Sequence, residues 1–123
     1  MADITNEMPY TPYIKQADLI NTDTAATKLF QLPADSRIAS IEVSNALLAT
    51  GGSVDVGVLL DPDYFVDGLD VASAASHVGS LLKSEWSDVP LDIYGLVAFT
   101  GAAAGGPFTV TLTYINRKSR KVL

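Results

Sequence analysis

A strict alternation near the C-terminal end constrains the fold of this chain more than any other feature. From residue 108 to 114 the even positions are apolar and the odd positions are threonine, in the order Phe108, Thr109, Val110, Thr111, Leu112, Thr113 and Tyr114. Successive side chains of a strand point to opposite faces, so this segment has one apolar face and one threonine face. A two-faced strand of this kind is typical of an antiparallel sheet that packs one side on a core and turns the other toward water.

The same period of two predicts strands elsewhere in the chain. Residues 39–44, 54–60 and 91–99 alternate, and shorter strands are expected at residues 27–32, before Pro33, and at residues 11–14. Ala39 is expected on the apolar face of its strand and Leu60 on that of the next. Glycines at 51 and 52 predict a turn. The small residues of the segment 100–107 predict a hairpin that joins the strand at 91–99 to the last strand.

Two segments do not follow the alternation. Residues 61–70 are rich in aspartate and contain Pro62 and Gly68, which predicts a solvated loop. Residues 71–82 are rich in alanine and serine, and Asp70 suits the N-cap of a helical turn there. No full amphipathic stripe supports a long helix in this segment.

These patterns predict one all-β domain, either an antiparallel β-sandwich or a jelly-roll-like barrel. We expect an extended N-terminal arm at residues 1–14, the β-sandwich at 15–115 and a basic C-terminal tail at 116–123. The 123 residues are enough to bury one sizeable core, and the absence of cysteine excludes disulfides and thiolate metal sites. The first residues lack the pattern of a signal peptide, and no apolar run approaches the length of a membrane helix.

Charge is divided unevenly along the chain. No lysine or arginine occurs from Ile38 to Leu82, a stretch in which five aspartates fall between positions 55 and 70. Half of the eight cationic side chains instead lie in the tail, as Arg117, Lys118, Arg120 and Lys121. Three interpretations of the tail stand side by side: a solvated terminus, a weak and salt-sensitive nucleic-acid contact, and pairing with an acidic neighbour such as the aspartate-rich segment of another copy. No aromatic residue is interleaved to stack bases, so we expect no specific nucleic-acid binding.

No motif predicts catalysis, a cofactor or a bound metal. The aspartates that begin at Asp61 do not match a calcium-binding EF-hand, because Phe65 and Val66 stand where an oxygen ligand and a glycine are required. Pro107 stands where a phosphate-binding loop needs lysine. His77 is the only histidine, and we expect it exposed or at a sheet edge rather than in a catalytic triad. The sequence therefore predicts no catalytic, cofactor-binding or metal-ligating residue, no enzyme activity and no small-molecule substrate.

Three stretches of the chain resemble small virion structural proteins of tailed phages, of the head-decoration or capsid-stabilising type. They are residues 38–45, the glycine turn with the "VDVG" strand at 51–57, and the aspartate-containing insertion at 61–68. The closing segment 100–114 also resembles the final hairpin of those proteins. The resemblance implies an all-β domain that assembles in many copies on a capsid or tail, and it carries over no site residue.

We therefore predict a capsid decoration or cement protein that stabilises a phage head by bridging capsomers. Its expected partners are the major capsid protein and copies of itself, as a homo-oligomer such as a trimer, in the virion after synthesis in the host cytoplasm and without a membrane. The expected partner contacts are Tyr10, Tyr13, Arg117, Lys118, Arg120 and Lys121. One alternative is a tail or head–tail connector component. The other is a carbohydrate-binding β-sandwich for adhesion, with Trp86, Tyr64 and Tyr94 as candidate aromatics.

Overall fold

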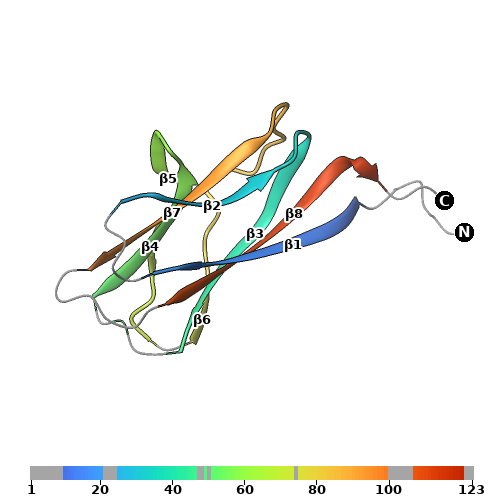
Figure 1. Ribbon diagram of the computed structural model, residues 1–123. Coiled ribbons are helices and arrows are strands. Elements are labelled where there is room, and N and C mark those ends of the chain that lie inside the picture. Colours follow the sequence, from blue (N-terminus) through green and yellow to red (C-terminus); the bar gives the residue numbers. More distant parts are fainter. Residues whose placement is uncertain are drawn as a thin grey trace, which may run out of the picture.

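The computed structural model describes residues 10–20, 25–46, 49, 51–73, 75–99 and 107–120. Within them the chain forms eight antiparallel strands in two four-stranded sheets, which confirms the predicted all-β sandwich (Figure 1). The strands are β1 (Tyr10–Leu19), β2 (Thr27–Leu32), β3 (Ser36–Asn45), β4 (Gly52–Val58), β5 (Asp61–Asp70), β6 (Ala75–Val78), β7 (Leu91–Phe99) and β8 (Phe108–Arg120).

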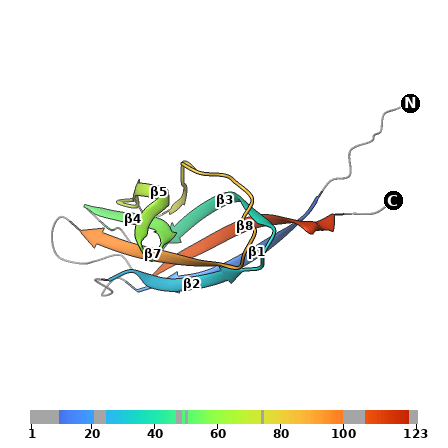
Figure 2. The ribbon, with the colours of Figure 1, turned by 90° about the horizontal axis from the view of Figure 1, so that it is seen from above.

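The two sheets have the strand orders β1-β8-β3-β6 and β2-β7-β4-β5. Most connections therefore carry the chain from one sheet to the other. β1 pairs with β8 along most of its length, and in both ribbon views this pair extends beyond its neighbours toward the start of β1 and the end of β8 (Figures 1 and 2). The beginning and the end of the described chain thus lie side by side.

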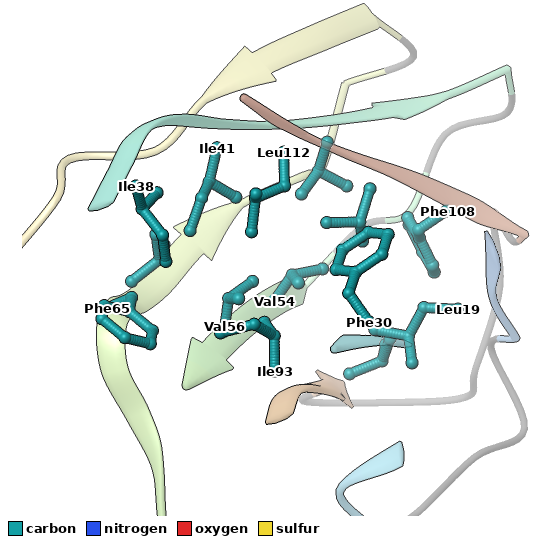
Figure 3. Close-up of a cluster of buried hydrophobic side chains, with 14 of the residues drawn as sticks. Leu19, Phe30, Ile38, Ile41, Val54, Val56, Phe65, Ile93, Phe108 and Leu112 are labelled. Atoms are coloured by element: carbon teal, nitrogen blue, oxygen red, sulfur yellow. The ribbon is translucent and has the colours of Figure 1, made fainter. Parts of the chain in front are cut away.

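The core lies between the two sheets (Figure 3). Ile41 and Leu112 come from one sheet and face Val54, Val56 and Ile93 from the other. All five side chains are fully buried. The even-numbered residues of β8 from Phe108 to Asn116 are buried and the odd-numbered ones are half-buried, so the alternation that opened the sequence analysis is confirmed.

The predicted solvated loop at residues 61–70 is wrong, because this segment is strand β5. It forms a hairpin with β4, in which Val58 pairs with Asp61 and Val56 pairs with Val66. Phe65 and Val66 are buried, while most of the polar residues take exposed or half-buried places. β5 is an edge strand whose register shifts twice against β4. An edge strand with bulges tolerates proline, glycine and charge, which is why its composition resembles that of a loop.

The predicted closing hairpin is also wrong. β7 and β8 belong to different sheets, and β8 pairs with β1 and β3 instead. Residues 100–106 lie outside the described chain. A connection that is rich in glycine and alanine suits a crossing between sheets as well as a hairpin, so composition did not separate the two.

Of the smaller expectations from the sequence, one is confirmed and two are wrong. Gly51 has a φ of 74°, and the N–H of Gly52 donates to the carbonyl of Ala49 at 2.7 Å, so the glycine turn is confirmed. The expected helical turn within residues 71–82 is replaced by the short strand β6. Ala39 is exposed rather than inward, because the register of β3 against β8 shifts between Ile38 and Ser40 and leaves Ala39 as the extra residue of a bulge.

Candidate interaction surface

One end of the sandwich gathers polar, aromatic and charged side chains from five parts of the chain. They are the start of β1, the end of β8, the β2–β3 turn, the β4–β5 turn and the segment 79–90. The pairs Tyr10–Arg120, Ser36–Asn116 and Ser36–Ser87 tie four of these parts together. Val58, next to the β4–β5 turn, lines a common hollow with Trp86. We call this region the terminal end of the sandwich.

Arg117, near the end of β8, connects several parts of the terminal end. Its backbone N–H donates to the carbonyl of Asp35 at 3.0 Å, and its Nε donates to the Asp35 carboxylate at 2.9 Å. Its terminal nitrogen lies 2.7 Å from Asp35 and 2.8 Å from Asp88. The two carboxylates raise the pKa of the Arg117 guanidinium above its ordinary value. The side chain thus joins β8 to the β2–β3 turn and to the segment 79–90.

Asn116 complements this clamp on the buried side of β8. Its amide donates to the carbonyl of Ala34 at 2.9 Å and to the hydroxyl of Ser36 at 3.0 Å. Between these two residues Asp35 adopts a φ of 68°, a left-handed conformation that aspartate tolerates better than most side chains. The strained turn is therefore held from both faces of one strand, by Asn116 inside and by Arg117 outside.

Trp86 is half-buried and lies beside two guanidinium groups. The guanidinium carbon of Arg37 is 5.9 Å from the ring centroid and that of Arg117 is 5.5 Å away, both within the range of cation–π attraction. Arg37 also donates to the hydroxyl of Ser84 at 3.0 Å, and this hydroxyl donates to the carbonyl of Ile38 at 3.1 Å. Trp86 thus packs against side chains of its own chain.

Tyr64 and Glu85 border a hollow of about 290 Å³ that Trp86 also lines. The Tyr64 hydroxyl donates to the Glu85 carboxylate at 2.7 Å, and this bond raises the pKa of Tyr64. Tyr94, the third aromatic considered for sugar binding, is half-buried on β7 at a position whose neighbours Ile93 and Gly95 are buried. The three aromatics therefore do not line one common hollow.

A second hollow, of about 420 Å³, opens beneath the projecting β1–β8 pair. We call it the tyrosine hollow, and its lining residues are Tyr13, Pro33, Ala34, Tyr114, Asn116 and Lys118. Tyr13 and Tyr114 are direct cross-strand partners with stacked rings, 5.3 Å between centroids and 25° between planes. Burial raises the pKa of the Tyr114 hydroxyl, with a smaller contribution from Tyr13. The wall of this hollow is thus largely aromatic and apolar, with one lysine beside it.

Five of the six expected partner-contact residues lie at this end of the described chain. Tyr13 and Lys118 are exposed and line the tyrosine hollow, whereas Arg117 uses its charge within the chain. Tyr10 and Arg120 pair through their backbones in the β1–β8 ladder. Lys121 lies outside the described residues, as do residues 1–9 of the expected arm. Residues 10–14 form the first half of β1, and β8 runs on through the position where we expected the tail to begin.

Two exposed leucines at the terminal end were missed by sequence reasoning. β4 ends at Val58, so Leu59 and Leu60 form the two-residue β4–β5 turn, where they are 58% and 95% exposed. The expectation that Leu60 faces the core is therefore wrong. Consecutive leucines break a period of two, and that interruption is the signal that could have located the turn.

The acidic residues do not form a compact ligand set. Among the described residues, no group of three or more His, Asp or Glu side chains is placed to hold a metal ion. Burial raises the pKa of Asp55, although its carboxylate accepts a 2.6 Å hydrogen bond from the N–H of Gly68. A hydrogen bond with Asp63 raises the pKa of Asp61.

His77 lies on the edge strand β6, as expected. Its Nε2 is 3.1 Å from the Asn45 side-chain oxygen and 2.8 Å from the carbonyl of Ser73. The amide of Asn45, in turn, donates to the carbonyls of Val71 and Ser73. Because both partners of Nε2 are oxygen acceptors, this nitrogen carries a proton and acts as a donor. The contact fastens the β5–β6 connection to β3 and does not pair the ring with a nucleophile.

The described residues contain no helix that could cross a membrane. The strand order defines an eight-stranded antiparallel β-sandwich, and chains from two phage capsids share this fold. A chain from the acidic stable capsid structure of Helicobacter pylori bacteriophage KHP30 superposes with a TM-score of 0.67 at 15% identity, over 87% of this chain and 90% of that one. A chain from the cyanophage Pam1 capsid gives 0.64 at 15% identity, over 94% and 92% of the two chains. No known family matches the sequence, and no curated protein matches it either.

Proposed function

We propose that this chain is a virion structural protein of a phage capsid, and more narrowly a decoration or cement protein that stabilises the head by bridging capsomers. The observation that carries the proposal is the likeness in fold to capsid chains along nearly the whole length of both partners. The likeness covers the fold and leaves the role to be tested. Its proposed partners are the major capsid protein and further copies of itself, arranged as a homo-oligomer such as a trimer, in virions assembled after synthesis in the host cytoplasm.

The terminal end supports an assembly role on physical grounds. Arg117 and Asn116 hold the β2–β3 turn to β8 within the chain, so the surface beside them is organised before any partner arrives. A pre-organised surface loses less conformational entropy on binding. Lattice symmetry then repeats each modest contact many times, and the combined avidity exceeds the affinity of one contact. The chain needs no catalytic group for such a task.

The test is the copy number and position of the chain in purified particles. Quantitative mass spectrometry and a cryo-electron microscopy map should place it on the outside of the head, in a fixed ratio to the major capsid protein. A head–tail connector component would instead appear in a single ring of low copy number. Absence from purified particles would reject every virion role.

A tail truncation tests the contribution of the chain ends. Deleting residues 119–123 leaves Arg117 and its contacts with Asp35 and Asp88 in place, so the monomer should fold while occupancy on particles falls. A deletion that begins at Arg117 would remove these contacts as well and would mix a folding defect with an assembly defect. Unchanged occupancy of the shorter truncation would show that the tail does not contribute to assembly.

The carbohydrate alternative has the hollow beside Tyr64 and Trp86 as its only structural support among the described residues. Arginine side chains already lie against the Trp86 ring, so the ring is less available as a platform for a sugar. Binding to a glycan array that is lost in a Tyr64→Ala variant would favour adhesion over capsid decoration.

A further inference from the structure

The β4–β5 turn, formed by Leu59 and Leu60, exposes two apolar side chains that folding alone does not require. We call it the leucine turn. Two-residue hairpin turns favour asparagine and glycine, which accept the positive φ angles of the common turn types. Among the described non-glycine residues only Asp35 has a positive φ, so neither Leu59 nor Leu60 adopts such an angle. Polar residues would serve the turn equally well in water. Two leucines at 58% and 95% exposure thus form a small apolar projection, which suits contact with an apolar surface.

The tyrosine hollow has complementary properties. It is an open hollow of about 420 Å³ at the surface, and the stacked rings of Tyr13 and Tyr114 give it an apolar wall. Lys118 lines it with an exposed side chain, and none of the ion pairs of the described chain involves this lysine. The tyrosine hollow and the leucine turn share no residue, although both lie at the terminal end.

Charge complementarity favours a second copy of this chain as the occupant of the tyrosine hollow. Asp61 and Asp63 directly follow the leucine turn, and their carboxyl groups are close enough to interact. The Asp61 carboxyl carries a raised pKa because it is hydrogen-bonded to Asp63 and feels its like charge, although Lys83 acts in the opposite direction. A further cation brought to this position would relieve the repulsion. The hollow offers such a cation in Lys118, beside an apolar cavity that suits the leucines.

We propose that the leucine turn of one copy of this chain inserts into the tyrosine hollow of a second copy, with Lys118 of the hollow pairing with Asp61 or Asp63 of the incoming turn. The leucine turn and the hollow are different surfaces of the same chain. The contact therefore forms twice in a two-fold dimer, or runs head to tail and closes into a ring when the rotation between copies closes. The contact deepens the proposed function, on which it rests for its biological setting, by naming the self-contact. It is expected in solution without any capsid.

Disulfide trapping tests the geometry, because the chain has no cysteine of its own. Leu60→Cys and Ala34→Cys are made as separate single variants and mixed under mild oxidation. Cross-linking requires Cα atoms within about 7 Å, so a mixed dimer should form only if the turn of one copy enters the hollow of another. The matched control replaces Leu60→Cys with Val78→Cys, which is 69% exposed on the edge strand β6. Equal cross-linking by the control, or none by the test pair at millimolar protein, would overturn the contact.

Charge reversal gives a second readout that does not depend on cysteine chemistry. Lys118→Glu should weaken self-association measured by sedimentation equilibrium, and adding Asp61→Lys in the same chain should restore it. Leu60→Ala should weaken association by about tenfold or more, since a buried leucine contributes at least one factor of ten. The control Lys28→Glu carries the same charge change on β2, five residues before Pro33 of the hollow, and should leave association unchanged. Failure of the double variant to recover would contradict the pairing.

These results separate the self-contact from the proposed function. A chain found on particles that gives no specific cross-link retains its virion role and loses this contact. A chain that cross-links specifically but is absent from particles retains the contact and loses the virion role.

Discussion

Replacing Phe65 by alanine provides the sharpest test of how the aspartate-rich segment contributes to the fold. Phe65 is 4% exposed and lies close to Ile38 between the sheets (Figure 3). It lines a small hollow together with Leu32 and Ile38. Phe-to-Ala substitutions in cores cost about 3–5 kcal/mol, which combines the lost transfer free energy with that of the cavity left behind. The edge-to-face contact with Tyr64, at 5.0 Å between centroids, adds about 0.5–1.5 kcal/mol to what the substitution removes.

We expect a loss in the lower half of this range, about 3–4 kcal/mol, because Phe65 also borders the hollow lined by Trp86 and water can enter the space it leaves. For a chain of this length that loss lowers the Tm by roughly 10–15 °C. Urea unfolding at fixed protein concentration, followed by far-UV circular dichroism and by fluorescence of the single tryptophan, measures the change in unfolding free energy.

Two variants calibrate the result. Phe65→Leu keeps most of the buried volume and should cost less than about 1.5 kcal/mol. Val89→Ala removes a side chain that is 62% exposed in the connection before β7 and should change stability by less than about 0.5 kcal/mol. If Phe65→Ala also fell within 0.5 kcal/mol of the unaltered protein, residues 61–70 would be a solvated loop and the β4–β5 pairing would be wrong.

Further predictions concern charge, backbone and metal. Asp55→Asn should stabilise the fold at pH 7, because burial raises the pKa of the Asp55 carboxyl in the folded state above its ordinary 3.8. The cost of burying the ionised carboxylate therefore develops as the pH rises through these pKa values. Urea unfolding should show a gain in unfolding free energy for the variant at pH 7 and no gain at pH 3. Gly57→Ala should destabilise by about 1–3 kcal/mol in the same assay, since its Cβ would lie 2.3 Å from the carbonyl oxygen of Asp61; a neutral result would contradict the tight β4–β5 hairpin. Arg117→Ala should lower the Tm. Arg117→Lys should lower it less, because lysine keeps the positive charge but lacks the planar guanidinium that contacts both Asp35 and Asp88. An unchanged Tm in Arg117→Lys would show that only the charge of Arg117 matters. A chelator should leave the Tm unchanged, and a large drop would indicate a bound cation.

Much of the sheet structure could be predicted because local alternation reflects burial. In β8 the threonines mark the outward face, and no bulge interrupts the segment 108–114 against β1. β2, β4 and β7 were recognised for the same reason. The strand expected at residues 39–44 lies within β3, but the bulge places Ala39 on the exposed face and not on the apolar face where the alternation had put it. Such a bulge depends on pairing with β8, a partner about seventy residues away in the chain.

The candidate interaction surface could not be predicted from the sequence, because pairing between distant parts of the chain creates it. Arg117 lies next to Lys118 in the sequence, and composition assigns both to one basic tail. The ladder between Ser36 and Asn116 brings Asp35 to Arg117, and the bridge between Ser36 and Ser87 brings the Trp86 segment beside it. No local pattern in a single sequence encodes either encounter. Arg117 pairs with Asp35 and Asp88 whereas Lys118 lines the tyrosine hollow, so these two neighbouring charges do not act as one group.

In the proposed self-contact, the end of β8 serves both folding and assembly. Arg117 turns toward Asp35 and Asp88 and joins three parts of its own chain, whereas Lys118 is exposed beside the tyrosine hollow. Successive side chains of a strand point to opposite faces, so neighbouring cations are assigned to opposite tasks by backbone geometry alone. The rigidity that Arg117 gives to the β2–β3 turn also fixes Pro33 and Ala34, which form a wall of that hollow. Loss of Arg117 should therefore weaken the self-contact even though its own charge does not reach the neighbouring copy, and Lys118→Glu should weaken the contact without lowering the Tm of the monomer.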